Sequence, residues 1–139
     1  MDSNDQAVTD NYERLDPRAV AKVAGGGYAE TREIFRAMHE AAIAMSPTVS
    51  GTMTTIYIKY VDPEVSPQPF AVLWIKKSTE MIMAFSHPDD YSAVGLLQAE
   101  RPYKYADLNT LLTVSAGHKV PDQLGEWMRD AYQHRAATA

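Results

Sequence analysis

The sequence has no cysteine among its 139 residues. This absence excludes a disulfide framework, a thiolate zinc site, an iron–sulfur cluster and a cysteine nucleophile. No run approaches the roughly eighteen apolar residues that a membrane helix requires, and residues 1–10 lack the basic start and apolar core of a secretory signal. We therefore expect a cytoplasmic protein that makes no membrane contact and has no redox chemistry of its own.

A surplus of basic residues is also missing, because 13 Lys and Arg face 18 Asp and Glu, for a net charge of −5. Broad nucleic-acid binding requires a basic surface that neutralises phosphates. We therefore do not expect nucleic acid as the main partner. A nucleic-acid accessory domain stays open as a third hypothesis, because this composition still allows a local basic patch.

Metal-binding and catalytic motifs are absent as well. None of the four histidines stands in a His-x-x-x-His or Glu-x-x-His pattern, and no Ser-His-Asp order is legible. We therefore expect no metal and no cofactor. The alternative is a small enzyme or metal-handling protein that uses His87, Asp89 or His118, although a Pro-Asp-Asp turn already explains the residues that follow His87.

What the sequence does contain is β-strand signal. Residues 52–60 are rich in β-branched and aromatic side chains, and residues 70–77 and 80–86 are apolar on both faces of an alternating strand. Residues 111–115 predict a brief fourth strand. An antiparallel sheet with one solvated face alternates with polar residues, so the second face of this sheet must be covered by a helix, a subunit or a ligand.

Helices are expected before and after these strands along the chain. Residues 1–24 predict a polar tail with one short helix after Asp16 and Pro17, and residues 25–139 predict a single domain. Apolar side chains recur at helical spacing over residues 28–45 and 121–135. The fold class is therefore α+β, with an antiparallel β-sheet of about four strands packed by N- and C-terminal helices.

Aromatic and basic side chains suggest where a ligand binds. If the helices cover one face, the other forms a groove with an aromatic floor and a cationic rim, which suits a small anionic or planar ligand or a second subunit. The predicted ligand-binding residues are Tyr57, Lys59, Trp74, Lys76, Met83, Phe85, Arg101 and Tyr103. The competing interpretation places Tyr57 and Trp74 in the core, with the lysines extending along its edge.

Several short stretches resemble a known family: MSPTV at 45–49, TIYIK at 55–59, FAV at 70–72, VPD at 120–122, EW at 126–127 and AY at 131–132. Over about residues 28–132 the chain resembles the small bacterial domains of unknown function DUF5655, grouped with the DUF1801 (YdhG-like) domains. The resemblance implies a bacterial origin and the α+β fold. Some of the related domains have been proposed to be iron chaperones. This sequence has no cluster of carboxylates to support that role, and a shared fold does not transfer function.

The functional hypothesis is therefore an uncharacterised binding or protein-interaction module with an aromatic and basic sheet face. Whether it also catalyses a reaction stays open at this point.

Overall fold

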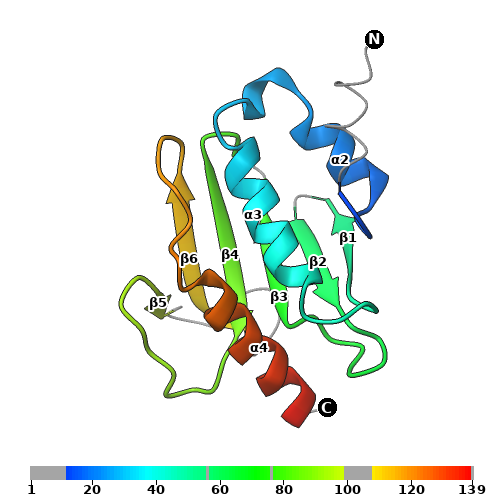
Figure 1. The fold of residues 1–139 in the computed structure, drawn as a ribbon, viewed down its shortest axis with the longest axis vertical. Coiled ribbons are helices and arrows are strands. Elements are labelled where there is room, and N and C mark those ends of the chain that lie inside the picture. The colour runs from blue at the N-terminus through cyan, green and yellow to red at the C-terminus, as the bar shows by residue number, and fades with distance from the viewer. Residues whose placement is uncertain (1–11, 56, 76, 99–107, 139) are drawn as a thin grey trace.

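The computed structural model describes residues 12–55, 57–75, 77–98 and 108–138. In this part of the chain, three α-helices and one sheet of six strands form an α+β fold, which confirms the predicted class. The strands are β1 (Ser50–Thr54), β2 (Tyr57–Val61), β3 (Ala71–Trp74), β4 (Glu80–Ser86), β5 (Leu97–Gln98) and β6 (Leu108–Ser115), in the order β1-β2-β3-β4-β6-β5 (Figure 1). Every neighbouring pair is antiparallel.

The predicted count of about four strands is wrong, chiefly because residues 52–60 form a hairpin instead of one strand. β1 and β2 pair antiparallel, with Thr54 opposite Tyr57. Thr55 in the turn has a φ of 28°, which a β-branched residue rarely adopts. Tight hairpin turns are commonly recognised in a sequence by an Asn-Gly or Asp-Gly pair. This turn has neither pair.

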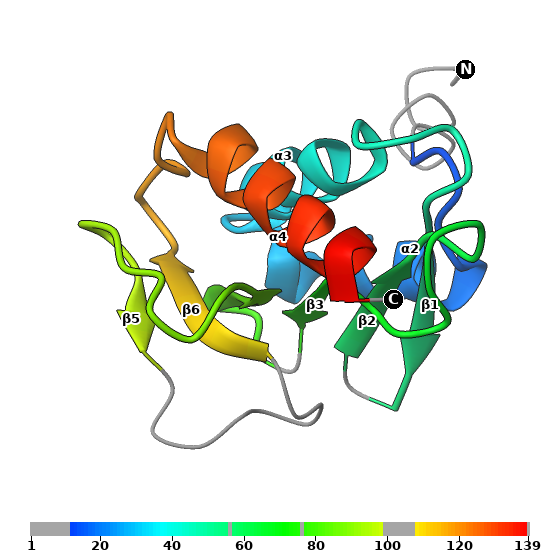
Figure 2. The ribbon, with the colours of Figure 1, turned by 90° about the horizontal axis from the view of Figure 1, so that it is seen from below.

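Two helices cover one face of the sheet. Helix α3 (Arg32–Ile43) and helix α4 (Leu124–Thr138) lie side by side above the strands in Figure 2. Their apolar sides meet the sheet residues that point toward them, and together these form the main core. Its fully buried members include Phe35, Met38, Leu73, Met83, Phe85 and Met128.

The segment before α3 belongs to the packed body, whereas a polar tail was expected up to residue 15. Tyr12 is buried in the core, and the Arg14 guanidinium donates hydrogen bonds to the carbonyls of Ile43, Ser46 and Val49 at the end of α3. Helix α2 (Pro17–Val23) follows and lies beside β1 (Figure 1). A polar sequence can therefore still be held in place by hydrogen bonds to a neighbouring element.

The same segment closes one edge of the sheet. The backbone of residues 14–16 exchanges hydrogen bonds with Gly51, and the Asp16 carboxylate accepts one from the Met53 amide at 3.0 Å. Arg18 donates to the Met53 carbonyl at 2.8 Å. These contacts satisfy edge groups of β1 that otherwise offer a template for pairing with another chain.

Candidate functional site

Three of the predicted ligand-binding residues share one face of the sheet. Tyr57 lies opposite Trp74 on the neighbouring strand, and their rings stack with centroids 5.0 Å apart. Lys59 pairs with Val72 two positions along, so it points to the same side. This second face, turned away from α3 and α4, also carries a small apolar cluster of Tyr57, Val72, Ala84 and Leu108, with Trp74 and Leu111 packed against it.

Met83 and Phe85 do not belong to that face, which corrects the groove predicted from the sequence. Met83 lies opposite Leu73 and Phe85 lies opposite Ala71, so both point toward the helices. Each is fully buried in the main core. The alternation of side chains between the two faces of β4 can be read from the sequence. The pairing of β4 with β3 decides which of the two alternating sets lies on the same face as Trp74.

The remaining predicted members of the groove, Lys76, Arg101 and Tyr103, lie outside the described residues. Among the described members of the predicted groove, Lys59 is therefore the one basic residue.

The residues proposed for the enzymatic alternative are not brought together. His87 follows the C-terminal end of β4, and His118 follows the C-terminal end of β6. Because β4 and β6 are antiparallel neighbours, these two ends lie at opposite ends of the strand pair. Asp89 is exposed. Within the described residues, no group of three His, Asp or Glu side chains is arranged to hold a metal ion.

His87 is instead a structural residue. It is fully buried, with Nδ1 at 2.6 Å from the Thr110 hydroxyl and Nε2 at 2.8 Å from the Trp127 carbonyl. Its ring lies between the rings of Phe85 and Tyr91, whose centroids are 5.2 and 3.8 Å away. Burial lowers the pKa of His87, so the imidazole is held neutral at pH 7.

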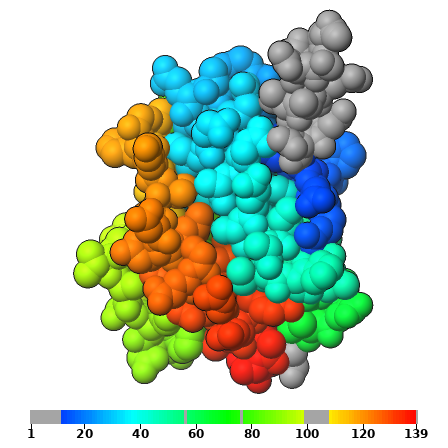
Figure 3. Space-filling model, viewed as in Figure 1, coloured from blue at the N-terminus to red at the C-terminus, as the bar shows by residue number. Residues whose placement is uncertain are grey.

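Tyr91 also lines a surface hollow that was not predicted from the sequence. This α4 hollow is a shallow depression, open to solvent, of about 460 Å³ between the turn after β4 and the second half of α4. It is lined by Pro88, Tyr91, Asp130, Gln133, His134 and Ala137. The segment that carries Pro88 and Tyr91 runs alongside α4 on the surface in Figure 3. The hollow therefore combines ring and methyl groups with several polar groups.

Hydrogen bonds position the polar groups of the α4 hollow. The Tyr91 hydroxyl donates to Asp130 Oδ2 at 2.7 Å, and burial together with this carboxylate raises the pKa of Tyr91 well above its usual value. His134 Nδ1 lies 3.2 Å from the hydroxyl oxygen of Ser86 at the end of β4. Asp130 and His134 are four residues apart on α4, so they face the same side of the helix.

A glycine allows the segment after β4 to approach α4 closely. Gly95 has a φ of 104°, and a Cβ at this position would come within 3.1 Å of the Trp127 ring. Most other residues are strained at such a φ. Gly95 therefore helps to hold the wall that carries Pro88 and Tyr91 against the helix.

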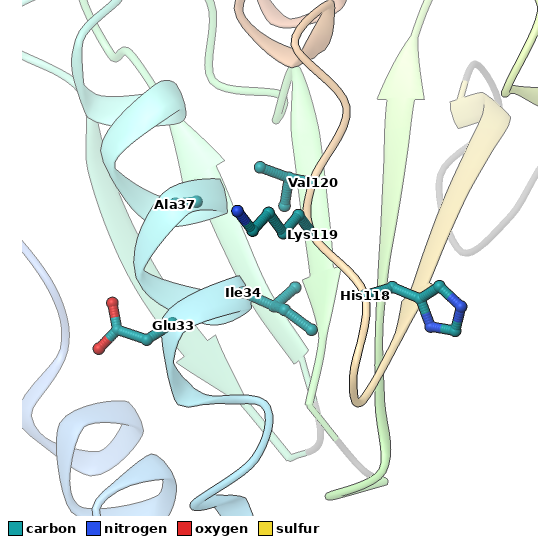
Figure 4. A pocket seen from close by; sticks show the side chains of 6 residues that line it. All are labelled: Glu33, Ile34, Ala37, His118, Lys119 and Val120. Carbon is teal, nitrogen blue, oxygen red and sulfur yellow. The ribbon is translucent and has the colours of Figure 1, made fainter.

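A second hollow, of about 310 Å³, lies between α3 and the loop before α4 (Figure 4). Its floor is apolar, from Ile34, Ala37 and Val120, and the Lys119 side chain extends across it toward α3. Glu33 and His118 point away from this space. Its polar groups do not converge, so it offers less basis for specific recognition than the α4 hollow.

The sequence contained one weak signal for the α4 hollow. Asp130 and His134 stand at i and i+4 on a strongly predicted helix, beside its apolar stripe. The sequence did not indicate that the irregular segment after β4 brings Tyr91 next to Asp130.

No family model, no curated protein and no solved structure matches this chain. The resemblance to DUF5655 therefore stays a prediction, and the function must be argued from the site itself. Within the described residues, no helix is both long and apolar enough to cross a membrane.

Proposed function

We propose that this protein is a binding module that takes a small molecule in the α4 hollow. The observation that carries the proposal is the convergence of Tyr91, Asp130 and His134 on one hollow of about 460 Å³. A few polar groups beside apolar surface are the usual lining of small-molecule sites. The raised pKa of Tyr91, which lines the hollow, also favours a site here.

Binding is favoured over hydrolysis because of where Ser86 lies. Ser86 and His134 are in hydrogen-bonding distance, as in a nucleophile and its base, but Ser86 is fully buried. A substrate carbonyl needs to reach the serine oxygen, and this burial denies it access. The pair therefore supports a role in positioning the His134 ring.

The test uses two alanines that are adjacent on α4. Ala137 lines the hollow and is exposed, so Ala137→Phe fills the space without disturbing the core. Ala136→Phe is the matched control, because Ala136 is exposed and does not line the hollow. Compounds found by a thermal-shift and NMR screen of metabolites, sugars, amines and nucleotides are expected to lose about tenfold or more in affinity in Ala137→Phe only, a loss worth about 1.4 kcal/mol.

Two outcomes contradict the proposal. One is a screen in which no compound shifts resonances of residues 88–91 or 130–137. The other is a set of bound compounds whose affinity Ala137→Phe leaves unchanged.

The second face of the sheet is the other candidate, and the half-buried Trp74, stacked on the buried Tyr57 and on the same face as Lys59, favours it. An aromatic surface with a cation suits a planar or anionic molecule, or a second subunit. Trp74→Ala is then expected to abolish that binding or dimerisation with little loss of stability. A loss of about 3–5 kcal/mol, with unchanged mass by light scattering and unchanged ligand response, assigns Trp74 to packing alone.

A further inference from the structure

Among the described residues, the charges near the α4 hollow are mostly negative. Asp130 lies inside it, and Glu126 lies one turn earlier on the same helix and acts electrostatically on Tyr91. Asp89 and Asp90 are exposed in the turn between Pro88 and Tyr91. Of the described basic residues, Arg135 is turned away, since its guanidinium donates to the Pro69 carbonyl. Arg129, like Glu126, Asp89 and Asp90, is exposed and does not line the hollow, so the described residues near it carry more negative than positive charge. An anion is therefore repelled here and a cation is attracted.

The Asp130 carboxylate has room for a further donor. Its Oδ2 accepts from the Tyr91 hydroxyl, and within residues 12–55, 57–75, 77–98 and 108–138 no hydrogen bond reaches its Oδ1. A carboxylate accepts several hydrogen bonds, and those from a charged donor are the strongest. The tyrosine hydroxyl fixes the carboxylate in position, so a donor arriving from the hollow meets a preorganised acceptor.

The aromatic wall adds a second attraction for a cation. The Tyr91 ring lines the hollow, and its contact with the fully buried His87 holds it in place. Aromatic ring faces attract ammonium groups within about 6 Å of the centroid. Pro88 and Ala137 supply apolar surface beside it, which suits the hydrocarbon part of an amphipathic molecule.

We infer that the α4 hollow binds a small organic amine in its protonated form, with the ammonium group on Asp130 Oδ1 and against the Tyr91 ring, and the hydrocarbon part against Pro88 and Ala137. This inference rests on the proposed function and adds the chemical class of the ligand. The exposed carboxylates of Glu126, Asp89 and Asp90, which are near these residues in the chain, attract the same class of molecule.

The test compares three probes of similar size that differ in charge: benzylamine, benzyl alcohol and benzoate. Binding to the full-length chain is measured by NMR titration at pH 7. Benzylamine is expected to shift the resonances of residues 88–91 and 130–137, with benzyl alcohol at least about tenfold weaker, since the alcohol lacks the positive charge that the carboxylate and the Tyr91 ring attract. Benzoate is expected to leave these resonances unchanged.

The protein variants separate a specific contact from surface charge. Asp130→Asn keeps an acceptor for the Tyr91 hydroxyl and removes only the charge, so it should retain the melting temperature and lose benzylamine affinity about tenfold or more. Asp122→Asn removes the same charge from an exposed position that precedes α4 and does not line the hollow, and should leave the affinity within about twofold.

Three results overturn the inference: equal affinity for benzylamine and benzyl alcohol, an equal loss in both aspartate variants, or no shift by benzylamine at the hollow. A neutral or anionic compound that binds in the hollow and is excluded by Ala137→Phe also overturns the cationic class while leaving the binding function standing. The failure of the class and the failure of the function are therefore distinguishable.

Discussion

At the scale of single residues, the charge state of His39 follows from its surroundings. His39 is buried, with Nδ1 at 2.9 Å from the Tyr60 hydroxyl and Nε2 at 2.8 Å from the Glu13 carbonyl. The carbonyl can only accept, so Nε2 donates and Nδ1 accepts from the tyrosine. Burial lowers the pKa of His39, and Arg14 and Arg36 nearby lower it further.

The sign of the resulting pH dependence is fixed by linkage. In the unfolded chain a histidine takes up a proton near pH 6.5, whereas His39 and His87 resist protonation in the folded protein. The unfolded state then binds more protons below about pH 6.5. The free energy of unfolding should therefore fall as the pH drops from 7.5 to 5.5, by at most about 1.4 kcal/mol per pH unit for each histidine.

His39→Gln tests this assignment, because glutamine can keep one acceptor and one donor in that place and does not titrate. Urea unfolding between pH 7.5 and 5.5 should show a shallower pH dependence in this variant than in the native protein. His118→Gln, at an exposed histidine, is the control for the substitution itself. The same slope in His39→Gln and in the native protein contradicts the prediction.

At the scale of elements, α4 completes both the core and the α4 hollow. Leu124, Trp127, Met128 and Ala131 are its buried apolar side, while Asp130 and His134 face the hollow. Two polar contacts fix its second half to the sheet ends: the Tyr132 hydroxyl donates to Asp62 at 2.6 Å, and Arg135 donates to the Pro69 carbonyl. One helix therefore links stability to the proposed site.

Removing α4 should unfold the protein. A chain that ends before Pro121 loses this buried side and uncovers Met83 and Phe85 on the sheet, so it should be insoluble or lack a cooperative thermal transition. Trp127→Ala is the milder variant, expected to cost about 3–5 kcal/mol in urea unfolding, as for buried aromatic residues in general. A soluble truncated chain that melts cooperatively means that the core has been placed wrongly.

At the scale of the whole molecule, the described residues form a body held together by packing and hydrogen bonds. Helices α3 and α4 share one core with the sheet, and the described residues offer no group of three side chains suited to a metal ion. We therefore expect stability to be independent of divalent metals, because a metal that binds only the folded state raises its melting temperature.

EDTA provides the measurement. The melting temperature should be the same, within the error of a thermal scan, with and without about 1 mM EDTA, a concentration at which a bound ion that contributes to folding would be removed. Protein that has been dialysed and then given zinc or magnesium is the control. A clear drop with EDTA that added metal reverses reopens the hypothesis of a metal site that includes His87 or Asp89.

Much of this architecture was determined by the sequence alone, because its causes are local. The period of residues 28–45 and 121–135 predicted helices close to α3 and α4, and the short apolar runs at residues 70–77 and 80–86 predicted β3 and β4. Proline and capping residues placed α2 after Asp16. Helical and strand periods are properties of neighbouring residues, so they are legible without a partner.

Only the tertiary structure decided which of these local elements face one another. Strand register placed Met83 and Phe85 in the core and Tyr57, Lys59 and Trp74 on the second face, and no local pattern specifies that pairing when both faces are apolar. The α4 hollow brings residues about forty positions apart into contact, and a single irregular segment sets their approach. Contacts at such separation depend on the whole packed chain, which is why the sequence determined the elements and the fold determined the site.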